Sequence, residues 1–332
     1  MSSEVRVIDA HVLGTPVRLL VGGVPTPKGA TLEKRRDWLA RHADELRTAV
    51  LTDPRGQVDL VGALLTEPVT PGADAGLIGM DAGGYGLASA PAVVAATTVA
   101  LERGLLVKSP TGEGERRGVS LVLDTLAGTT HVRAFVAERE RRVDRVTLAP
   151  PQSWVVRAGH DARLGDRRLR VDLAWAGALY AVLDGEAAGL PLASDRLGDL
   201  RRLGCAICES SVLPNVGLPA NATLAGVVFT GPPRAADAHL RIATVTEGGV
   251  CDRSGLSGAA AVLSLLHGMG LASDETPVIF ESLYGLRAHA VIERIVAREG
   301  DYAVASTISA SAWVTGEATL ILDDDDPLKH GA

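Results

Sequence analysis

The chain has 332 residues, of which 46% are hydrophobic and 22% are charged. This length and balance fit a globular protein of two ordinary domains with substantial cores, and they exclude a disordered chain. The net charge of −7 argues against nucleic acid as a partner, because general nucleic-acid binding depends on lysine and arginine contacts to phosphate.

The first half of the chain reads as strands around one amphipathic and one apolar helix. In chain order we expect two strands within 5–21, an amphipathic helix over 31–51, a turn at 53–56, a strand over 58–65, a loop over 68–79, a buried helix within 82–101 and strands at 119–124, 131–136 and 143–148. Gly104 is expected to cap the buried helix at its C-terminal end.

The second half repeats this plan. In chain order we expect strands within 169–183, a helix near 197–210, strands at 227–230 and 240–246, a buried helix within 254–273 and strands over much of 278–309. A last strand, 312–322, is expected to return to the first domain. The predicted domains are therefore 1–148 plus 311–332, and 149–310.

The two predicted buried helices, within 82–101 and 254–273, contain no Asp, Glu, Lys or Arg. Glycine, proline, serine and histidine interrupt them, so both suit helices packed in protein better than membrane spans. Residues 9–14 (DAHVLG) resemble residues 172–177 (DLAWAG), at nearly the same offset as the two helices. We interpret this as an internal duplication, and the alternative is two unrelated strands.

Small residues occupy the expected start of each buried helix. A helix start offers unpaired backbone N–H groups and a partial positive charge, which can hold a carboxylate or phosphate. Two such starts in one chain suggest one shared anion site.

The cysteine count favours a reducing cytoplasm, since three cysteines and no secretory signal do not suit a disulfide framework. Cys205 and Cys208 form a C-x-x-C pair, which suits a redox pair or half of a zinc site. The pair lies in a predicted helix and no second ligand pair follows, so we favour packing residues and expect no metal site. Cys251 and His11 are likewise interpreted as structural.

The whole chain resembles the proline racemase family, which includes hydroxyproline epimerases and trans-3-hydroxyproline dehydratases. The resemblance is carried by an ordered series of short motifs: Ile8-Asp9-Ala10-His11, Pro54-Arg55-Gly56, Gly62-Ala63-Leu64-Leu65-Thr66, Phe229-Thr230-Gly231-Pro232-Pro233, Asp252-Arg253-Ser254, Glu281-Ser282, Trp313-Val314-Thr315-Gly316 and Asp325-Asp326-Pro327-Leu328. It implies two pseudo-symmetric α/β domains of the diaminopimelate epimerase-like fold. Each would be a mostly antiparallel sheet or barrel around a central helix, with the active site in the cleft.

The resemblance also implies cofactor-free chemistry at the α-carbon of a cyclic amino acid, with a cysteine at each helix start as acid or base. This chain departs from that pattern twice. Ser89-Ala90-Pro91 stands where the family has Cys-Gly-His, and Gly255-Leu256-Ser257 stands where it has Pro-Cys-Gly. Ser89 is therefore the candidate catalytic residue, while Leu256 has no proton to exchange.

The role of each candidate site residue has an alternative. Ser89 could serve only as the N-cap of its helix, and Ser257 could substitute for the lost second acid or base. The resemblance places Asp252 against the substrate amine, and the alternative for Asp252 is helix-start electrostatics. The substrate-binding candidates are Ala90, Pro91, Asp252, Ser257 and Gly258.

The leading functional hypothesis is a divergent family member that acts on proline or a hydroxyproline. Racemisation needs proton donors on opposite faces, so the loss at Leu256 favours dehydration over epimerisation. The alternative is a pseudoenzyme that binds a small cyclic amino acid or regulates a partner without turnover. The resemblance further suggests a homodimer.

Overall fold

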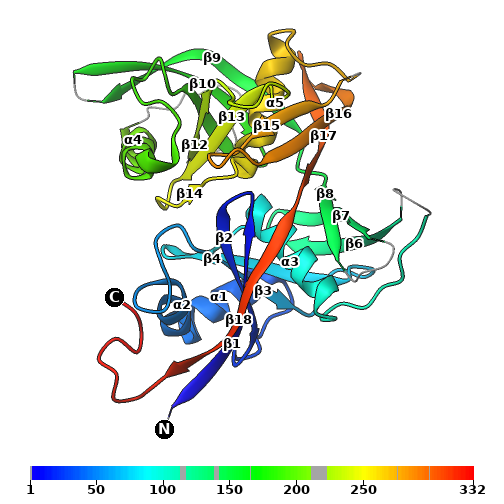
Figure 1. Ribbon diagram of the computed structural model, residues 1–332, viewed down its shortest axis with the longest axis vertical. Coiled ribbons are helices and arrows are strands. Elements are labelled where there is room, and N and C mark those ends of the chain that lie inside the picture. The colour runs from blue at the N-terminus through cyan, green and yellow to red at the C-terminus, as the bar shows by residue number, and fades with distance from the viewer. Residues whose placement is uncertain are drawn as a thin grey trace. The chain divides into compact units, whose positions relative to one another are not determined.

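A computed structural model describes residues 2–112, 117–137, 142–164, 166–210, 223–274, 276–298 and 300–332. The chain divides into two compact units (Figure 1). The first unit comprises 1–148 with 310–332, and the second comprises 149–309.

The first unit is a mixed sheet with helices on it. Its strands are β1 (Ser3–Val12), β2 (Thr15–Gly22), β3 (Val61–Thr66), β4 (Ala75–Asp81), β5 (Gly84–Gly86), β6 (Gly118–Thr125), β7 (Gly128–Val136), β8 (Val143–Leu148) and β18 (Ala312–Leu322). Its helices are α1 (Leu32–His42), α2 (Asp44–Leu51) and α3 (Ala90–Glu102). The main strand order is β18-β1-β2-β3-β4-β6-β7-β8, so the last strand of the chain pairs with the first.

The second unit has the same plan. Its strands are β9 (Ser153–Leu164), β10 (Arg167–Ala176), β11 (Leu179–Asp184), β12 (Leu224–Gly231), β13 (Leu240–Thr246), β14 (Cys251–Asp252), β15 (Val278–Glu281), β16 (Arg287–Arg298) and β17 (Asp301–Ala310). Its helices are α4 (Leu197–Ser210) and α5 (Ala259–Gly268), each preceded by a short 3₁₀ turn, η2 (Ser194–Arg196) and η3 (Leu256–Gly258). The order β9-β10-β11-β12-β13-β15-β16-β17 closes into a barrel where Val304 pairs with Ser153.

The direction of strand pairing matches between the units. The parallel pairs are β2/β3 and β4/β6 in the first unit, and β11/β12 and β13/β15 in the second, while the other neighbours in the two orders run antiparallel. Each unit inserts its apolar helix at the same point, α3 after β5 and α5 after β14. This correspondence confirms the predicted duplication and the predicted fold class.

The apolar helices are central in their units. Residues 91–100 of α3 and 259–265 of α5 are all buried. The sheet surrounds a helix that is apolar on every side, because every face of that helix gains by leaving water. α3 packs on β1, β2, β8 and β18, and α5 packs on β9, β10 and β16.

Four local features differ from the predictions. The expected helix over 31–51 is two helices, broken at Ala43 (φ −144°), whose carbonyl accepts the Tyr85 hydroxyl at 3.0 Å. The expected loop over 68–79 contains β4, and β9 was not predicted. The first apolar helix begins only at Ala90, because Gly84–Gly86 forms β5 on the edge of β4.

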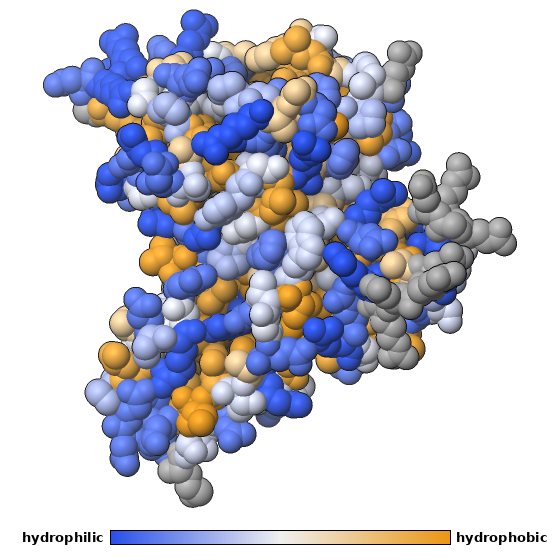
Figure 2. Space-filling model, viewed as in Figure 1, coloured by the Kyte–Doolittle hydropathy of each residue, from blue (hydrophilic) through white to orange (hydrophobic). Residues whose placement is uncertain are grey.

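The visible face of the molecule is mostly polar, with hydrophobic side chains in separate patches (Figure 2). Among the described residues, no helix is both long enough and apolar enough to span a bilayer.

Candidate active site

The start of α3 carries Ser89, Ala90 and Pro91 together, in the first unit. Ser89 is the N-cap, with an extended backbone (φ −64°, ψ 159°), and its Oγ accepts a hydrogen bond from the Ala92 N–H at 3.4 Å. The Val93 N–H donates to the Ser89 carbonyl at 3.0 Å. Ser89 therefore does act as the helix cap.

Pro91 reduces what this helix start can bind. It occupies the second helical position, where it supplies no N–H. The Ala92 N–H is already used by Ser89, so the Ala90 N–H is the amide of the first turn that is left for an anion. The partial positive charge of the helix end remains.

Ser89 has no activating base within the described part of the first unit. Its side chain is partly exposed, and the Ala92 N–H is the hydrogen-bond partner found for its hydroxyl there. A serine hydroxyl needs a neighbouring base to become a strong nucleophile or proton acceptor. Any proton transfer at Ser89 must therefore avoid leaving a net charge on the serine.

The start of α5, in the second unit, is built differently. Gly255 has φ +70°, which an L side chain rarely adopts, and the η3 turn then leads into the helix. Leu256 is 2% exposed and belongs to the interior. Gly258 lies against the Val228 side chain so closely that it has no room for a Cβ.

Asp252 organises this second start. It is 2% exposed, and its Oδ1 accepts from the Ser254 N–H at 3.0 Å and from the Ser254 hydroxyl at 2.5 Å. Its Oδ2 accepts from the Ser257 N–H at 2.9 Å. The second helix start thus holds a carboxylate of its own chain, where the sequence suggested room for an external anion.

The Ser257 hydroxyl is buried and has no hydrogen-bond partner among the described residues. A buried hydroxyl without a partner is unfavourable, so this atom is available to a ligand. Its backbone amide, in contrast, is occupied by Asp252.

Sequence reasoning missed two residues at the second start, Ser254 and Tyr180. Ser254 donates to Asp252 and its Oγ accepts from the Leu256 N–H at 3.3 Å. Burial, together with the negative charge of Asp252, raises the pKa of Tyr180 to about 12. Tyr180 follows the duplicated segment 172–177, but nothing in its spacing to Asp252 pointed to their proximity.

The cysteines and His11 show structural environments. Burial is the main cause that raises the pKa of Cys208 to about 12, so this thiol stays protonated and unreactive. Cys205 and Cys208 both pack against the core of the second unit. Cys251 is fully buried in that core. His11 stacks on Trp313 at 5.0 Å, and burial lowers the pKa of the imidazole.

No group of three or more His, Cys, Asp or Glu side chains suited to a metal ion occurs in the part of the chain that the structure describes.

The proline racemase family model matches residues 7–332. The chain belongs to the proline racemase family. It is 29% identical to a proline racemase of Clostridioides difficile, over 99% of this chain and 98% of that protein. It is 30% identical to a trans-3-hydroxy-L-proline dehydratase of Bacillus thuringiensis, over 100% of this chain and 98% of that protein.

A solved structure has the same fold over nearly the whole length. The hydroxyproline epimerase of Agrobacterium vitis, solved with bound trans-4-hydroxy-L-proline, matches with a TM-score of 0.82 and 26% identity, covering 99% of this chain and 94% of that one.

Proposed function

We propose that this protein acts at the α-carbon of a hydroxyproline and that it catalyses dehydration rather than racemisation. The observation that carries the proposal is the asymmetry of the two helix starts. The first helix start has the partly exposed Ser89, which carries a hydroxyl. The second has Leu256, which is buried and carries no exchangeable proton. Two-base racemisation needs a proton carrier on each face of the ring, and Leu256 is not one.

Trans-3-hydroxy-L-proline can lose water by a reaction on one face of its ring. Its hydroxyl is trans to the carboxylate, so the hydroxyl and the α-proton lie on the same face of the ring. One serine can then reach both groups. Ser89 Oγ takes the α-proton while its own proton passes to the leaving hydroxyl.

This step is balanced and leaves no charge on Ser89. The Cα–H and C3–O bonds break, the Cα–C3 double bond forms, and the hydroxyl departs as water. The resulting enamine gains a proton at C3 and loses one from nitrogen to become the cyclic imine. A relay of this kind needs no activating base, which fits the surroundings of Ser89.

The remaining candidate residues have binding roles in the proposal. The substrate carboxylate lies at the start of α3, near the Ala90 N–H and the positive helix end, with Pro91 as part of the wall. In the second unit, Asp252 is the proposed partner of the ring nitrogen, and Ser257 and Gly258 are further substrate-binding candidates. No cofactor is required.

A binding protein without turnover is the second candidate. It is favoured by the loss of both family cysteines together with Pro91 at the position of the motif histidine. Such a protein would keep affinity for a small cyclic amino acid.

The deciding experiment is proton NMR in deuterated water with L-proline, D-proline and the 3- and 4-hydroxyprolines. Loss of the trans-3-hydroxy-L-proline signals with a new imine product supports dehydration, and Ser89→Ala should abolish it. Deuterium exchange with inversion at the α-carbon would instead establish racemisation or epimerisation. Unchanged spectra with measurable binding would establish the binding protein, and absence of binding would show another ligand class.

We also propose that the protein is located in the cytoplasm and forms a homodimer. The three cysteines form no disulfide in the described residues, which supports the cytoplasm. Size-exclusion chromatography with light scattering tests the dimer.

A further inference from the structure

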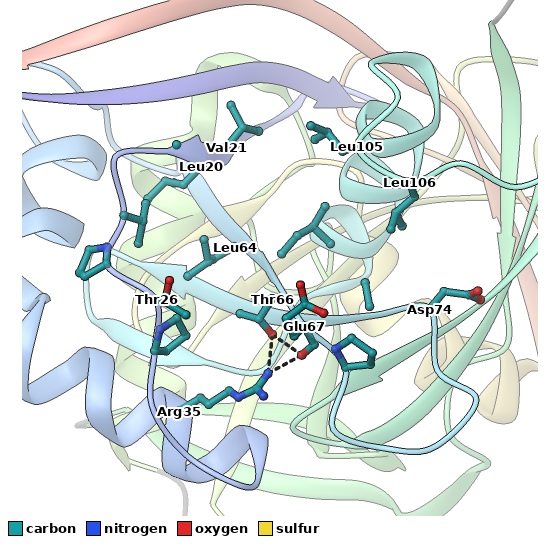
Figure 3. A pocket seen from close by; sticks show the side chains of 17 residues that line it. Leu20, Val21, Thr26, Arg35, Leu64, Thr66, Glu67, Asp74, Leu105 and Leu106 are labelled. Atoms are coloured by element: carbon teal, nitrogen blue, oxygen red, sulfur yellow. Dashed lines mark hydrogen bonds between the residues drawn. The ribbon is translucent and has the colours of Figure 1, made fainter.

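The first unit contains a cavity of about 490 Å³. It lies where β2 and β3 end, where β4 begins, and beside the turn after α3 (Figure 3). Its volume is in the range of small-molecule sites.

The cavity is separate from Ser89. Ser89 precedes the first residue of α3, whereas the cavity-lining Leu105 and Leu106 follow its last residue. A helix of 13 residues is about 20 Å long. A molecule the size of an amino acid cannot reach both ends.

One guanidinium lines the cavity. Arg35 Nε donates to the Gly29 carbonyl at 3.1 Å, and Nη1 donates to Thr66 Oγ1 at 3.4 Å and to the Glu67 carbonyl. These acceptors are neutral, and no carboxylate lies within ion-pair distance of Arg35 among the residues described. Both N–H donors of Nη2 are left over, so Arg35 is held in place and can still bind a carboxylate.

A carboxylate lines the same cavity. The Glu67 side chain is exposed and has no ion pair or hydrogen bond within the described ranges. Asp74, at another part of the rim, is already paired with Lys108 at 2.8 Å. Arg35 and Glu67 therefore have no ion-pair partner among the described residues and do not pair with each other, while the charge of Arg35 acts at longer range on Asp124 and helps to lower its pKa.

The rest of the wall is apolar. It is formed by leucine, valine and proline side chains, chiefly Leu20, Val24, Pro25, Leu64, Leu105 and Leu106. Leu105 is 44% exposed, so a ligand in the cavity could cover it.

The corresponding end of the second unit is filled. There the segment after β11 places Leu190 and Leu192 in the core. The arginine of that end, Arg241, is paired with Glu281 and also donates to the Leu192 carbonyl at 3.2 Å. In the described residues of the second unit, these leucines and Arg241 are thus buried, whereas Arg35 of the first unit lines a cavity.

We infer that this cavity binds an apolar α-amino acid in its zwitterionic form. Arg35 binds the carboxylate, Glu67 binds the ammonium group, and the leucines cover the side chain. The site is independent of the chemistry proposed at Ser89.

Isothermal titration calorimetry tests the inference with L-leucine as the probe. Two fragments of leucine serve as comparisons, 4-methylpentanoate without the ammonium group and 3-methylbutylamine without the carboxylate. We expect L-leucine to bind about tenfold more tightly than either fragment, because each charged hydrogen bond adds affinity. Arg35→Gln and Glu67→Gln should each weaken leucine binding about tenfold.

Leu105→Asn keeps the inference testable if Arg35→Gln does not fold, since Leu105 is a half-exposed wall residue. It should also weaken binding. Val107→Asn is the matched control, because Val107 is 91% exposed and outside the cavity, and it should leave binding unchanged. Absence of leucine binding, equal affinity for a fragment, or binding unaffected by both Arg35→Gln and Leu105→Asn would overturn the inference.

Discussion

The two units place a buried carboxylate at the same point of the same fold and neutralise it in different ways. In the first unit, Asp124 near the end of β6 accepts hydrogen bonds from the N–H groups of Val69 and Thr70 at 2.7 and 2.8 Å. These residues follow β3, so the carboxylate fixes the chain where it leaves that strand. Asp124 pairs across the sheet with Gly76 of β4, which has no side chain to offer.

In the second unit, Glu281 in β15 holds the chain after β12 in the same manner. It accepts from the N–H groups of Arg234 and Ala235 at 3.0 and 2.8 Å. Its partner across the sheet is Arg241, which is buried and donates to Glu281 through Nε at 2.9 Å. The second unit therefore closes this end with an internal ion pair.

The comparison shows how a duplicated scaffold diverges. The carboxylate that holds a loop is kept in both units, because without it two backbone amides lose their acceptor. At this end of the second unit the cation, Arg241, is buried. In the first unit the cation, Arg35, lines a cavity. The helix starts diverge too, since the second contains its own carboxylate, Asp252, and the first is capped by a neutral serine.

The largest effect is expected from removing the charge of Glu281. Glu281→Gln leaves Arg241 buried without a counter-charge and should lower the free energy of unfolding by about 3–5 kcal/mol. Asp124→Asn strands no buried cation and should cost about 1–3 kcal/mol. Urea unfolding of the two variants measures the difference, and equal losses would contradict the contrast between the units.

Restoring thiols at both helix starts should bring the two units closer in chemistry. The double variant Ser89→Cys, Leu256→Cys should raise α-proton exchange of proline or a hydroxyproline by about a hundredfold or more, since acid–base groups supply rates of that order. Proton NMR in deuterated water measures the exchange.

Ser89→Cys alone is the control for the double variant, because it leaves Leu256 unchanged at the second helix start. If the folded double variant exchanges no faster than the wild type, Pro91 and the rebuilt second start have changed the site beyond its two side chains.

Acid should reduce the contribution of Glu281 to the stability of the second unit. Burial raises the pKa of Glu281, but hydrogen bonds from Ala235 and Arg241 and the charge of Arg241 outweigh it, so the pKa lies below its ordinary 4.5. A lowered native pKa adds stability above pH 4.5, and that stability is lost as the pH falls further.

The stability gap between wild type and Glu281→Gln should therefore narrow as the pH falls below about 4.5. Urea midpoints at several pH values measure it. A gap that widens in acid would mean that Glu281 does not carry a charge in the folded protein.

The sequence predicted the elements whose signals are local. Gly14 and Gly177 mark the turns of the two duplicated hairpins, with φ of 97° and 78°. The apolar helices were predicted from their lack of charge, and Gly104 ends the first of them with φ +68°.

Elements with tertiary causes were missed. β4 was hidden by its glycines, and Gly79 is required there because a Cβ would collide with the backbone of Leu87. β9 carries polar residues such as Arg157 and His160, which obscure the alternation of a strand.

The candidate site was only partly accessible from the sequence. Motif order located Ser89, Asp252 and Leu256, but the bonds of Asp252 to Ser254 and Ser257 depend on the turn at Gly255. The cavity beside Arg35 could not be predicted, because the residues that line it come from five separate parts of the chain.

The last pair of variants concerns the two helix starts. Asp252→Ala removes the acceptor of two buried backbone amides and should cost about 2–3 kcal/mol. Ser89→Ala removes one long hydrogen bond at a partly exposed position and should cost about 1 kcal/mol or less. Urea unfolding of the two variants gives both values. A larger loss for Ser89→Ala would mean that Ser89 is mainly structural, whereas a small loss in stability with complete loss of dehydration would assign it to the chemistry. Comparing the Asp252→Ala and Ser89→Ala variants therefore distinguishes the contribution of a helix start to stability from its contribution to the reaction.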